Sequence, residues 1–198
     1  MSYTIRSAEP ADRQALFDVC LRTADSGKDA SALYGDPLYP GVIWSVPYLE
    51  LEPRHAFVLA GPDGVVGYIV GAPDSARFAK RLEAEWWPQW RERFAGRVSE
   101  APHDVRVLEY IRNPPAPDAW LESEYPGHLH INILPHVQSG GWGRKLIETE
   151  LDSQRAAGVP GVHLGVSPTN HRAIGFYQHV GFSRLEALPG VVFGRKLA

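Results

Sequence analysis

The chain has 198 residues, of which 44% are hydrophobic and 22% charged, and its formal net charge is −3. We expect one domain over residues 1–198 with its own core, and the slightly acidic balance gives no reason to expect nucleic acid or an anionic membrane as a partner. Cys20 is the only cysteine, and we find neither a secretory signal nor a run of ~20 apolar residues, so we expect a cytoplasmic protein without disulfides.

The first part of the chain predicts a strand, a helix, a long irregular segment and a hairpin. Residues 3–6 have the pattern of an edge strand, and residues 10–20 that of an amphipathic helix. Residues 23–47 are rich in Gly, Asp, Pro and Ser, which predicts a long loop or a broken helix; such segments often form binding loops or lids. Residues 55–60 and 65–72 predict a hairpin around the turn Gly61-Pro62-Asp63-Gly64.

Residues 74–94 predict a helix that Pro88 should kink or split. Its large apolar side chains recur every four positions and form one stripe: Phe78, Leu82, Trp86, Trp90 and Phe94. A stripe of this kind is typical of a core face, but a dimer face or a wall of an acceptor site is an alternative, so a homodimer remains open. Residues 105–111 predict another strand, and residues 112–127 predict a proline-rich loop.

Residues 128–147 are the most informative segment. An alternating strand over residues 128–134 ends at Pro135, a glycine-rich turn follows, and a helix is expected from about Gly141 to Ala156. Backbone N–H groups at a helix N-terminus point to one place, and the helix dipole adds about half a positive charge there. Glycines let the backbone approach a phosphate closely. The segment therefore predicts a phosphate-bearing ligand at residues 138–144, where Arg144 and Lys145 either pair with a phosphate or lie on a solvated helix face.

The last part of the chain predicts two strands and a helix. Residues 162–167 have the pattern of a strand, and Pro168-Thr169-Asn170 that of a helix cap. Residues 171–179 carry apolar side chains at helical spacing, and residues 190–196 predict a final strand. Mixed strands and helices of this kind predict an α/β or α+β layer fold. No His or Cys spacing typical of a metal site is present, so we expect no metal.

Two motifs carry a family resemblance. No P-loop or dinucleotide motif is present. Instead, Gln138-x-x-Gly141-x-Gly143 resembles the pyrophosphate loop of the general-control-related N-acetyltransferase (GNAT) superfamily. A second GNAT block is similar to Asn170-x-x-Ala173-Ile174-x-Phe176-Tyr177-x-x-x-Gly181-Phe182. The first half of the chain resembles, more narrowly, the acetyltransferase-like C-terminal domain of O-GlcNAcase and its free-standing bacterial relatives, in the segments Pro47-Tyr48-Leu49, Phe57-Val58-Leu59, 63–68 and Trp86-Trp87-Pro88.

The resemblance implies a fold and a ligand. It implies the GNAT fold, a mixed and mostly antiparallel sheet that is splayed at its two central strands and flanked by helices. It also implies acetyl-CoA as cosubstrate, with the pantetheine arm along Ile131, Asn132 and Ile133. The other residues that it assigns to the coenzyme are Gln138, Ser139, Gly140, Gly141, Trp142, Gly143, Arg144, Asn170 and Tyr177.

The resemblance also implies catalytic roles. Tyr177 stands where the family places the proton donor for the departing thiolate; a core aromatic residue is the alternative. Many relatives carry a carboxylate at the position that Gly165 occupies in this chain. Glycine has no side chain and cannot act as a base. His130 is our preferred base because a histidine titrates near the working pH. Other candidates are His128, His136, His163 and a carboxylate of the 23–47 segment such as Asp25, Asp29 or Asp36.

These observations predict an acetyl-CoA-dependent N-acetyltransferase. The acceptor amine is not identified by any motif, so a small amine, a peptide N-terminus and a protein lysine all remain open. The missing carboxylate at Gly165 leaves open an alternative function, a catalytically weak acetyl-CoA-binding module with a sensing or recruiting role. A nucleotide-binding protein is a third and more remote alternative.

Overall fold

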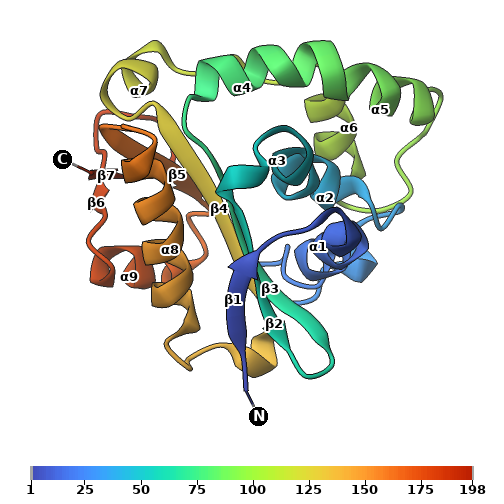
Figure 1. Ribbon diagram of the computed structural model, residues 1–198. Helices are drawn as coiled ribbons and strands as arrows, with labels where there is room; N and C mark the ends of the chain where they lie inside the picture. Colours follow the sequence, from blue (N-terminus) through green and yellow to red (C-terminus); the bar gives the residue numbers. More distant parts are fainter. Residues whose placement is uncertain (1, 198) are drawn as a thin grey trace.

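The computed structural model describes residues 2–197, and its strands form one seven-stranded sheet in the order β1-β2-β3-β4-β5-β7-β6 (Figure 1). Every neighbouring pair is antiparallel except β4 and β5, which are parallel. The predicted mixed and mostly antiparallel sheet is therefore confirmed. The strands are β1 (Thr4–Ser7), β2 (Ala56–Gly61), β3 (Gly64–Ala72), β4 (Gly127–Ile133), β5 (Gly161–Val166), β6 (Ser183–Arg184) and β7 (Val191–Lys196).

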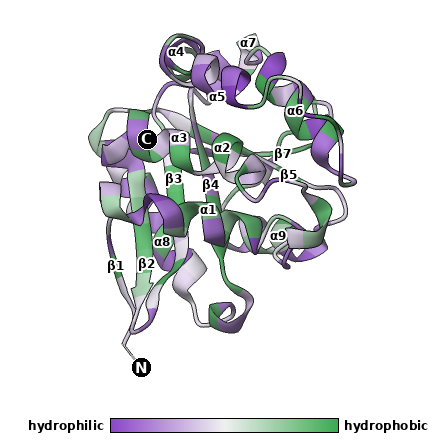
Figure 2. Cartoon of the chain, turned by 90° about the vertical axis from the view of Figure 1, so that its right-hand side faces the viewer, coloured by the Kyte–Doolittle hydropathy of each residue, from purple (hydrophilic) through white to green (hydrophobic). Residues whose placement is uncertain are grey.

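Helices cover both faces of the sheet. Helix α8 packs on β2, β3 and β4 from one face, and α1 and α3 pack on β3 from the other. Figure 2 shows the resulting contrast between the apolar strands β2 and β3 and the more polar outer helices. The helices are α1 (Arg13–Leu21), α2 (Tyr39–Trp44), α3 (Val46–Leu51), α4 (Ser75–Arg81), α5 (Trp87–Arg93), α6 (Asp104–Arg112), α7 (Ala119–Glu124), α8 (Trp142–Ala156) and α9 (His171–His179).

The N-terminal helices form a tightly packed layer. Gly41 of α2 lies so close to α1 that an added Cβ would meet the Phe17 ring at 2.3 Å, so only glycine permits this contact. Cys20 is 1% exposed, and burial raises the pKa of its thiol to about 11. Cys20 is thus a buried helix cysteine whose thiol keeps its proton at neutral pH. The 23–47 segment is a broken helix, with the 3-10 turn η2 (Ser31–Leu33) followed by α2.

Two expectations about residues 105–127 are wrong. Residues 105–111 belong to α6 and not to a strand, because the residues that this segment buries, Val107, Leu108 and Ile111, follow helical spacing while Val105 is 66% exposed. Residues 112–127 are not loop throughout, since α7 begins after Asp118, whose carboxylate accepts hydrogen bonds from two backbone N–H groups of the first turn.

The aromatic stripe of residues 78–94 belongs to the core. Trp86, Trp90 and Phe94 are at most 3% exposed, so this stripe is not a dimer face. The predicted break is present, because α4 and α5 are separated by the π-helical turn η4 (Leu82–Trp86). Pro88 has no N–H to donate to the carbonyl four residues earlier, which explains a local change of hydrogen-bond pattern. Within residues 2–197, no helix is both long and apolar enough to cross a membrane.

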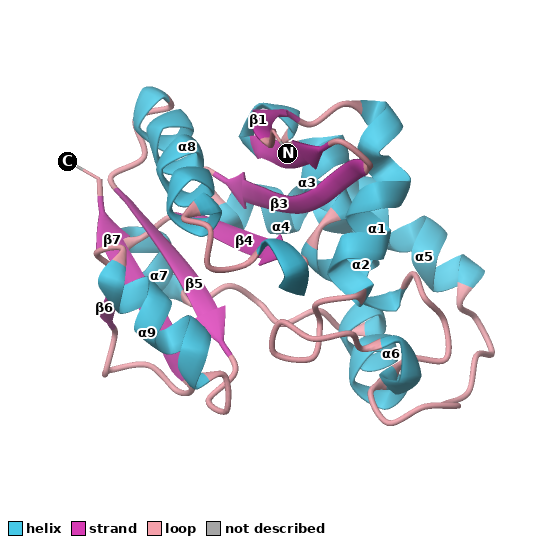
Figure 3. Cartoon of the chain, turned by 90° about the horizontal axis from the view of Figure 1, so that it is seen from below, coloured by secondary structure: helices cyan, strands magenta, loops and turns pink. Residues whose placement is uncertain are grey.

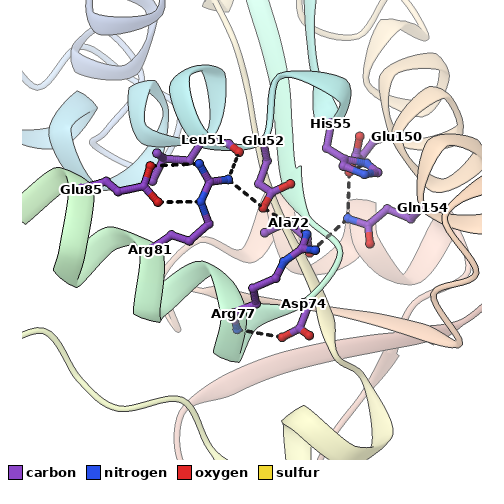
Figure 4. A network of polar contacts seen from close by, with 10 residues as sticks. All are labelled: Leu51, Glu52, His55, Ala72, Asp74, Arg77, Arg81, Glu85, Glu150 and Gln154. Carbon is purple, nitrogen blue, oxygen red and sulfur yellow. Dashed lines mark hydrogen bonds and ion pairs between the residues drawn. The ribbon is translucent and has the colours of Figure 1, made fainter.

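A buried polar cluster lies between α8 and the sheet (Figure 4). Glu150 and Gln154 are both fully buried. Gln154 Nε2 donates to Glu150 Oε1 at 2.8 Å and lies 3.4 Å from the carbonyl oxygens of Ala72 and His128. Gly71 provides the room, because a Cβ there would meet Glu150 Oε1 at 2.2 Å. Glu150 Oε2 has no hydrogen-bond partner among the described residues, so the charged form of this carboxyl is poorly solvated.

Replacing Glu150 by Gln should stabilise the fold at high pH. Burial raises the pKa of Glu150 above its ordinary value, so its contribution to stability is complete below the unfolded pKa and is lost as the pH rises through the folded pKa. Glutamine cannot ionise, and Glu150→Gln should therefore add about 1–2 kcal/mol at alkaline pH and close to nothing near pH 4. Urea unfolding at both pH values measures the difference.

The matched control for Glu150→Gln is Asp152→Asn, which removes a 73% exposed carboxylate from the same helix. It should change stability little at either pH. Equal destabilisation by Glu150→Gln at both pH values would contradict this account, since it would mean that the carboxylate is stabilised through its 3.4 Å contact with His55.

Candidate functional site

The central feature of the site is the gap between β4 and β5. These strands pair over only two positions, Gly127 with Val162 and His128 with His163, and then diverge (Figure 3). Residues 129–133 of β4 pair with β3 on one side, while their other edge faces the gap. An exposed strand edge offers backbone N–H and C=O groups to an extended ligand. The predicted splay is therefore present, beside the segment that contains Ile131, Asn132 and Ile133.

The glycine-rich turn lies where β4 leads into α8. A 3-10 turn, η5 (Pro135–Val137), is followed by residues 138–141. Ser139 has φ 70° and Gly141 has φ 76°, so two nearby residues adopt left-handed conformations. This backbone geometry and the free N–H groups of the first turn of α8 suit an anion. An added Cβ at Gly141 would meet no atom within 4 Å, so the space above this residue is open.

At the other two glycines of the turn, Gly140 and Gly143, a side chain would be crowded by neighbouring residues. A Cβ at Gly143 would lie 3.0 Å from the Phe176 ring, so this glycine lets α8 and α9 pack closely. At Gly140 the nearest atoms belong to Trp142, at 3.1 Å. Only Gly141 therefore combines a left-handed backbone with open space, which identifies it as the position where a side chain would most directly obstruct a ligand.

The turn is braced by side chains from outside it. Gln138 Nε2 donates to the Ile133 carbonyl at 2.7 Å, and it lies 3.4 Å from the Gly27 carbonyl oxygen. The guanidinium of Arg172, at the start of α9, donates to Gln138 Oε1 and to Ser139 Oγ. The Gln138 side chain thus holds the turn in place, and Arg172 brings a second cation to it. The sequence interpretation missed Arg172.

Three residues around the first turn of α8 differ in their contacts. Lys145 Nζ lies 4.3 Å from the centre of the Trp142 ring, a cation–π contact. Trp142 also packs edge-on against Tyr3. Arg144 is exposed and forms no ion pair within residues 2–197. Of the two predicted phosphate cations, Arg144 is therefore the freer one.

The second motif forms α9 as predicted. Asn170 caps this helix, since its Oδ1 accepts a hydrogen bond from the Ala173 N–H at 3.0 Å. Tyr177 is 7% exposed and packs against Phe176, Phe182 and Phe193. Burial raises the pKa of Tyr177 above its ordinary value, so its hydroxyl keeps its proton at neutral pH. On β4, the Asn132 amide donates to the Tyr68 hydroxyl at 2.8 Å.

A cavity of about 540 Å³, which we call the splay chamber, adjoins the gap. Its floor is formed by His128, His130, His163 and Gly165 of β4 and β5. Its walls come from α2–α6 and the proline-rich segment, and are largely aromatic and apolar: Trp44, Tyr48, Phe78, Trp87, Tyr110 and 114–117. The Trp-rich helices and part of the 23–47 segment thus line the chamber.

The two histidines of β4 differ from expectation. Desolvation, together with His163, lowers the pKa of His130 to about 4, so the expectation that it titrates near the working pH is wrong. Desolvation also lowers the pKa of His128, well below its ordinary value. Both are therefore neutral at pH 7. The rival carboxylates of the 23–47 segment, Asp25, Asp29 and Asp36, do not line the chamber.

Within the described part of the chain, no group of three or more His, Cys, Asp or Glu side chains is arranged to hold a metal ion. The predicted site residues thus fall into two places. The coenzyme candidates of β4 and the glycine turn border the gap or form the turn, and the histidines lie on the floor of the splay chamber. Asn170 and Tyr177 belong to α9, which contacts the turn through Arg172.

Comparisons with known proteins agree with this geometry. The family model for the Acetyltransferase (GNAT) family matches residues 30–182. The crystal structure of SsHAT is 36% identical, with a TM-score of 0.91 over 100% of both chains. The structure of yncA, a putative acetyltransferase from Salmonella typhimurium with its cofactor acetyl-CoA, has a TM-score of 0.58 at 15% identity over 100% of this chain and 95% of that one, and supports the fold alone.

Protein O-GlcNAcase of Rattus norvegicus is 26% identical over 210 residues, which cover 98% of this chain and 22% of the relative. The chain thus spans about a fifth of the length of this curated relative. The family match covers more than half of the chain and includes both motifs. The chain belongs to the GNAT family of acetyltransferases, whose acetyl donor is acetyl-CoA.

Proposed function

We propose that this chain, as a single domain, transfers the acetyl group of acetyl-CoA to the nitrogen of an amine. The observation that supports this most is the continuity of three features: the gap beside β4, the open glycine turn at its end and the splay chamber at its side. A long, flexible thioester fits the gap, its pyrophosphate fits the turn, and an acceptor fits the chamber. The lone cysteine is consistent with a cytoplasmic location.

The coenzyme contacts follow from this arrangement. Backbone groups of Ile131, Asn132 and Ile133 would bind the pantetheine arm, and the same edge would supply an N–H group to the thioester oxygen as it becomes negative. The pyrophosphate would lie at 138–144, with Arg144 as the nearby cation. Asn170 would contact the coenzyme through the amide nitrogen that its capping bond leaves free. Acetyl-CoA supplies an activated carbonyl carbon with a thiolate leaving group.

An amine is the acceptor that suits the chamber. An alkyl ammonium group has a pKa near 10.4 and must become neutral before it attacks. Apolar aromatic walls favour the neutral form by desolvation. Two carboxylates, Glu83 and Glu122, line the chamber against one ammonium group, that of Lys80, so the charged part of its lining is slightly acidic. The protonated hydroxyl of Tyr177 would donate a hydrogen bond, and finally a proton, to the departing sulfur.

Mass spectrometry of amines incubated with acetyl-CoA and the protein tests the proposal. A panel should include a small alkyl amine, a peptide with a free N-terminus and a protein rich in lysine, each beside a sample in which the amine is blocked in advance. We expect acetylation of at least one free amine and of no blocked one. Coenzyme binding without acetylation of any amine would contradict the proposal and favour the coenzyme-binding module.

A further inference from the structure

The three histidines on the floor of the splay chamber differ in which ring nitrogens form hydrogen bonds. For His128 and His163, these hydrogen bonds show which nitrogen carries the proton. The Ser75 hydroxyl donates its one proton to the Pro126 carbonyl at 2.7 Å. Its oxygen must then accept from His128 Nδ1, which is also 2.7 Å away. The second nitrogen of His128 accepts from the Tyr48 hydroxyl at 2.8 Å. Both nitrogens of His128 are thus engaged, so this residue has no lone pair for a substrate.

His163 has one nitrogen engaged and one free. Its Nδ1 lies 2.7 Å from the carbonyl oxygen of Tyr125. A carbonyl oxygen can only accept, so Nδ1 carries the proton and Nε2 carries the lone pair. No hydrogen bond to Nε2 is present within residues 2–197. The Tyr125 carbonyl therefore fixes both the tautomer and the orientation of the ring, which is the arrangement that a general base requires.

His130, by contrast, is held by no side-chain hydrogen bond from the described residues, and its ring packs against those of Tyr48 and His128, with centroids 5.4 Å and 6.1 Å away. Nothing fixes its tautomer, and no group supports a positive charge on it. For His163, the backbone carbonyls of Tyr125 and Gly127 and the charge of Asp118 favour the protonated ring and oppose the desolvation that lowers its pKa. His163 is therefore the better proton acceptor of the two.

The position of His163 suits this role. It pairs with His128 at the last position before β4 and β5 diverge, and it lines the splay chamber together with Gly165. Gly165 lies two residues further along β5, on the same face of the strand. It is exposed, and an added Cβ there would meet no atom within 4 Å. The route from the chamber to the gap is thus free of a side chain at this point.

We infer that His163, through Nε2, accepts the proton of the attacking amine. This inference rests on the proposed acetyl transfer and names the base that the sequence left open. As the nitrogen–carbon bond forms, the amine becomes acidic and its proton moves to Nε2. The carbon–sulfur bond breaks, and its electron pair leaves with the sulfur, which takes a proton from Tyr177. The products are an N-acetylated amine and free CoA, and His163 and Tyr177 later exchange the proton through solvent.

Release of the CoA thiol, followed with n-butylamine as acceptor, tests the inference. His163→Asn keeps an N–H near the place of Nδ1 but has no basic nitrogen. It should lower kcat by at least about 100-fold while the KM for acetyl-CoA stays unchanged. His130→Asn is the matched control and should lose far less. Free imidazole should restore part of the lost rate to His163→Gly and none to His130→Gly. A histidine with only a structural role would not show this rescue.

A full kcat in His163→Asn, or rescue of His130→Gly in place of His163→Gly, would overturn the inference. If the wild-type protein released no thiol with any amine, the proposed function itself would fail. The ¹⁵N spectrum of the histidine rings still decides the role of His163 in that case, because it needs no turnover. A bare Nε2 of His163 that shifts when n-butylamine is added supports the inference, and a proton on Nε2 contradicts it.

Discussion

Gly141→Glu should weaken acetyl-CoA binding by at least about 100-fold, or about 2.8 kcal/mol. Gly141 has φ 76°, which costs a residue with a side chain on the order of 1–2 kcal/mol. The new side chain would project into the open space above the turn, and its carboxylate would occupy the region where the helix N-terminus attracts the pyrophosphate. Isothermal titration with acetyl-CoA measures the loss.

Gly158→Glu is the matched control for this experiment. Gly158 has φ 75° and equally open surroundings, but it lies just beyond the other end of α8. It should therefore show the same backbone strain, visible as a lower melting temperature, with acetyl-CoA affinity unchanged. Equal losses of affinity in both variants would show that strain alone is responsible. Full acetyl-CoA affinity in Gly141→Glu would show that the pyrophosphate does not bind at the glycine turn.

Tyr177→Phe should lower kcat by about 100-fold or more while acetyl-CoA binding changes little. Only the hydroxyl is lost, and the ring can keep its contacts with Phe176, Phe182 and Phe193. Burial raises the pKa of this hydroxyl and keeps it protonated, so the loss should not depend on pH across the neutral range. Steady-state thiol release at several pH values, beside titration with acetyl-CoA, separates catalysis from binding.

The matched control for Tyr177→Phe is Tyr39→Phe. Tyr39 is 2% exposed and packs against Phe94 in the layer of N-terminal helices, and it does not line the splay chamber. Its substitution should leave kcat at the wild-type value. Unchanged turnover in Tyr177→Phe would assign this tyrosine to the core and leave the thiolate to be protonated by water.

Local patterns predicted the elements whose side chains alternate or repeat clearly. Strands β2, β3 and β4 and helices α8 and α9 lie within two residues of the expected bounds. The helix α6 was missed because Val105 and Val107 alternate with charged residues as in a strand, while the burial of Leu108 and Ile111 depends on contacts of α6 with α2 and α5. Tertiary packing, which is not local, decides such cases.

The site was predictable only where one contiguous segment forms it. The glycine turn and the capping role of Asn170 follow from neighbouring residues, and both were predicted. Arg172 reaches the turn from a helix more than thirty positions away, and no sequence signal marks that contact. The ranking of the histidines depends on Tyr125, Ser75 and Tyr48, which are distant in sequence from the side chains that they orient.

Hydrogen–deuterium exchange of the protein with and without acetyl-CoA tests the central claim most directly. The account predicts slower exchange in two segments, residues 129–133 of β4 and residues 139–144 of the glycine turn, because their N–H groups would bind the coenzyme. Residues 156–160, which line a second cavity on another part of the surface, should exchange at the same rate in both samples. Protection confined to that second cavity, or no protection at all, would contradict the account.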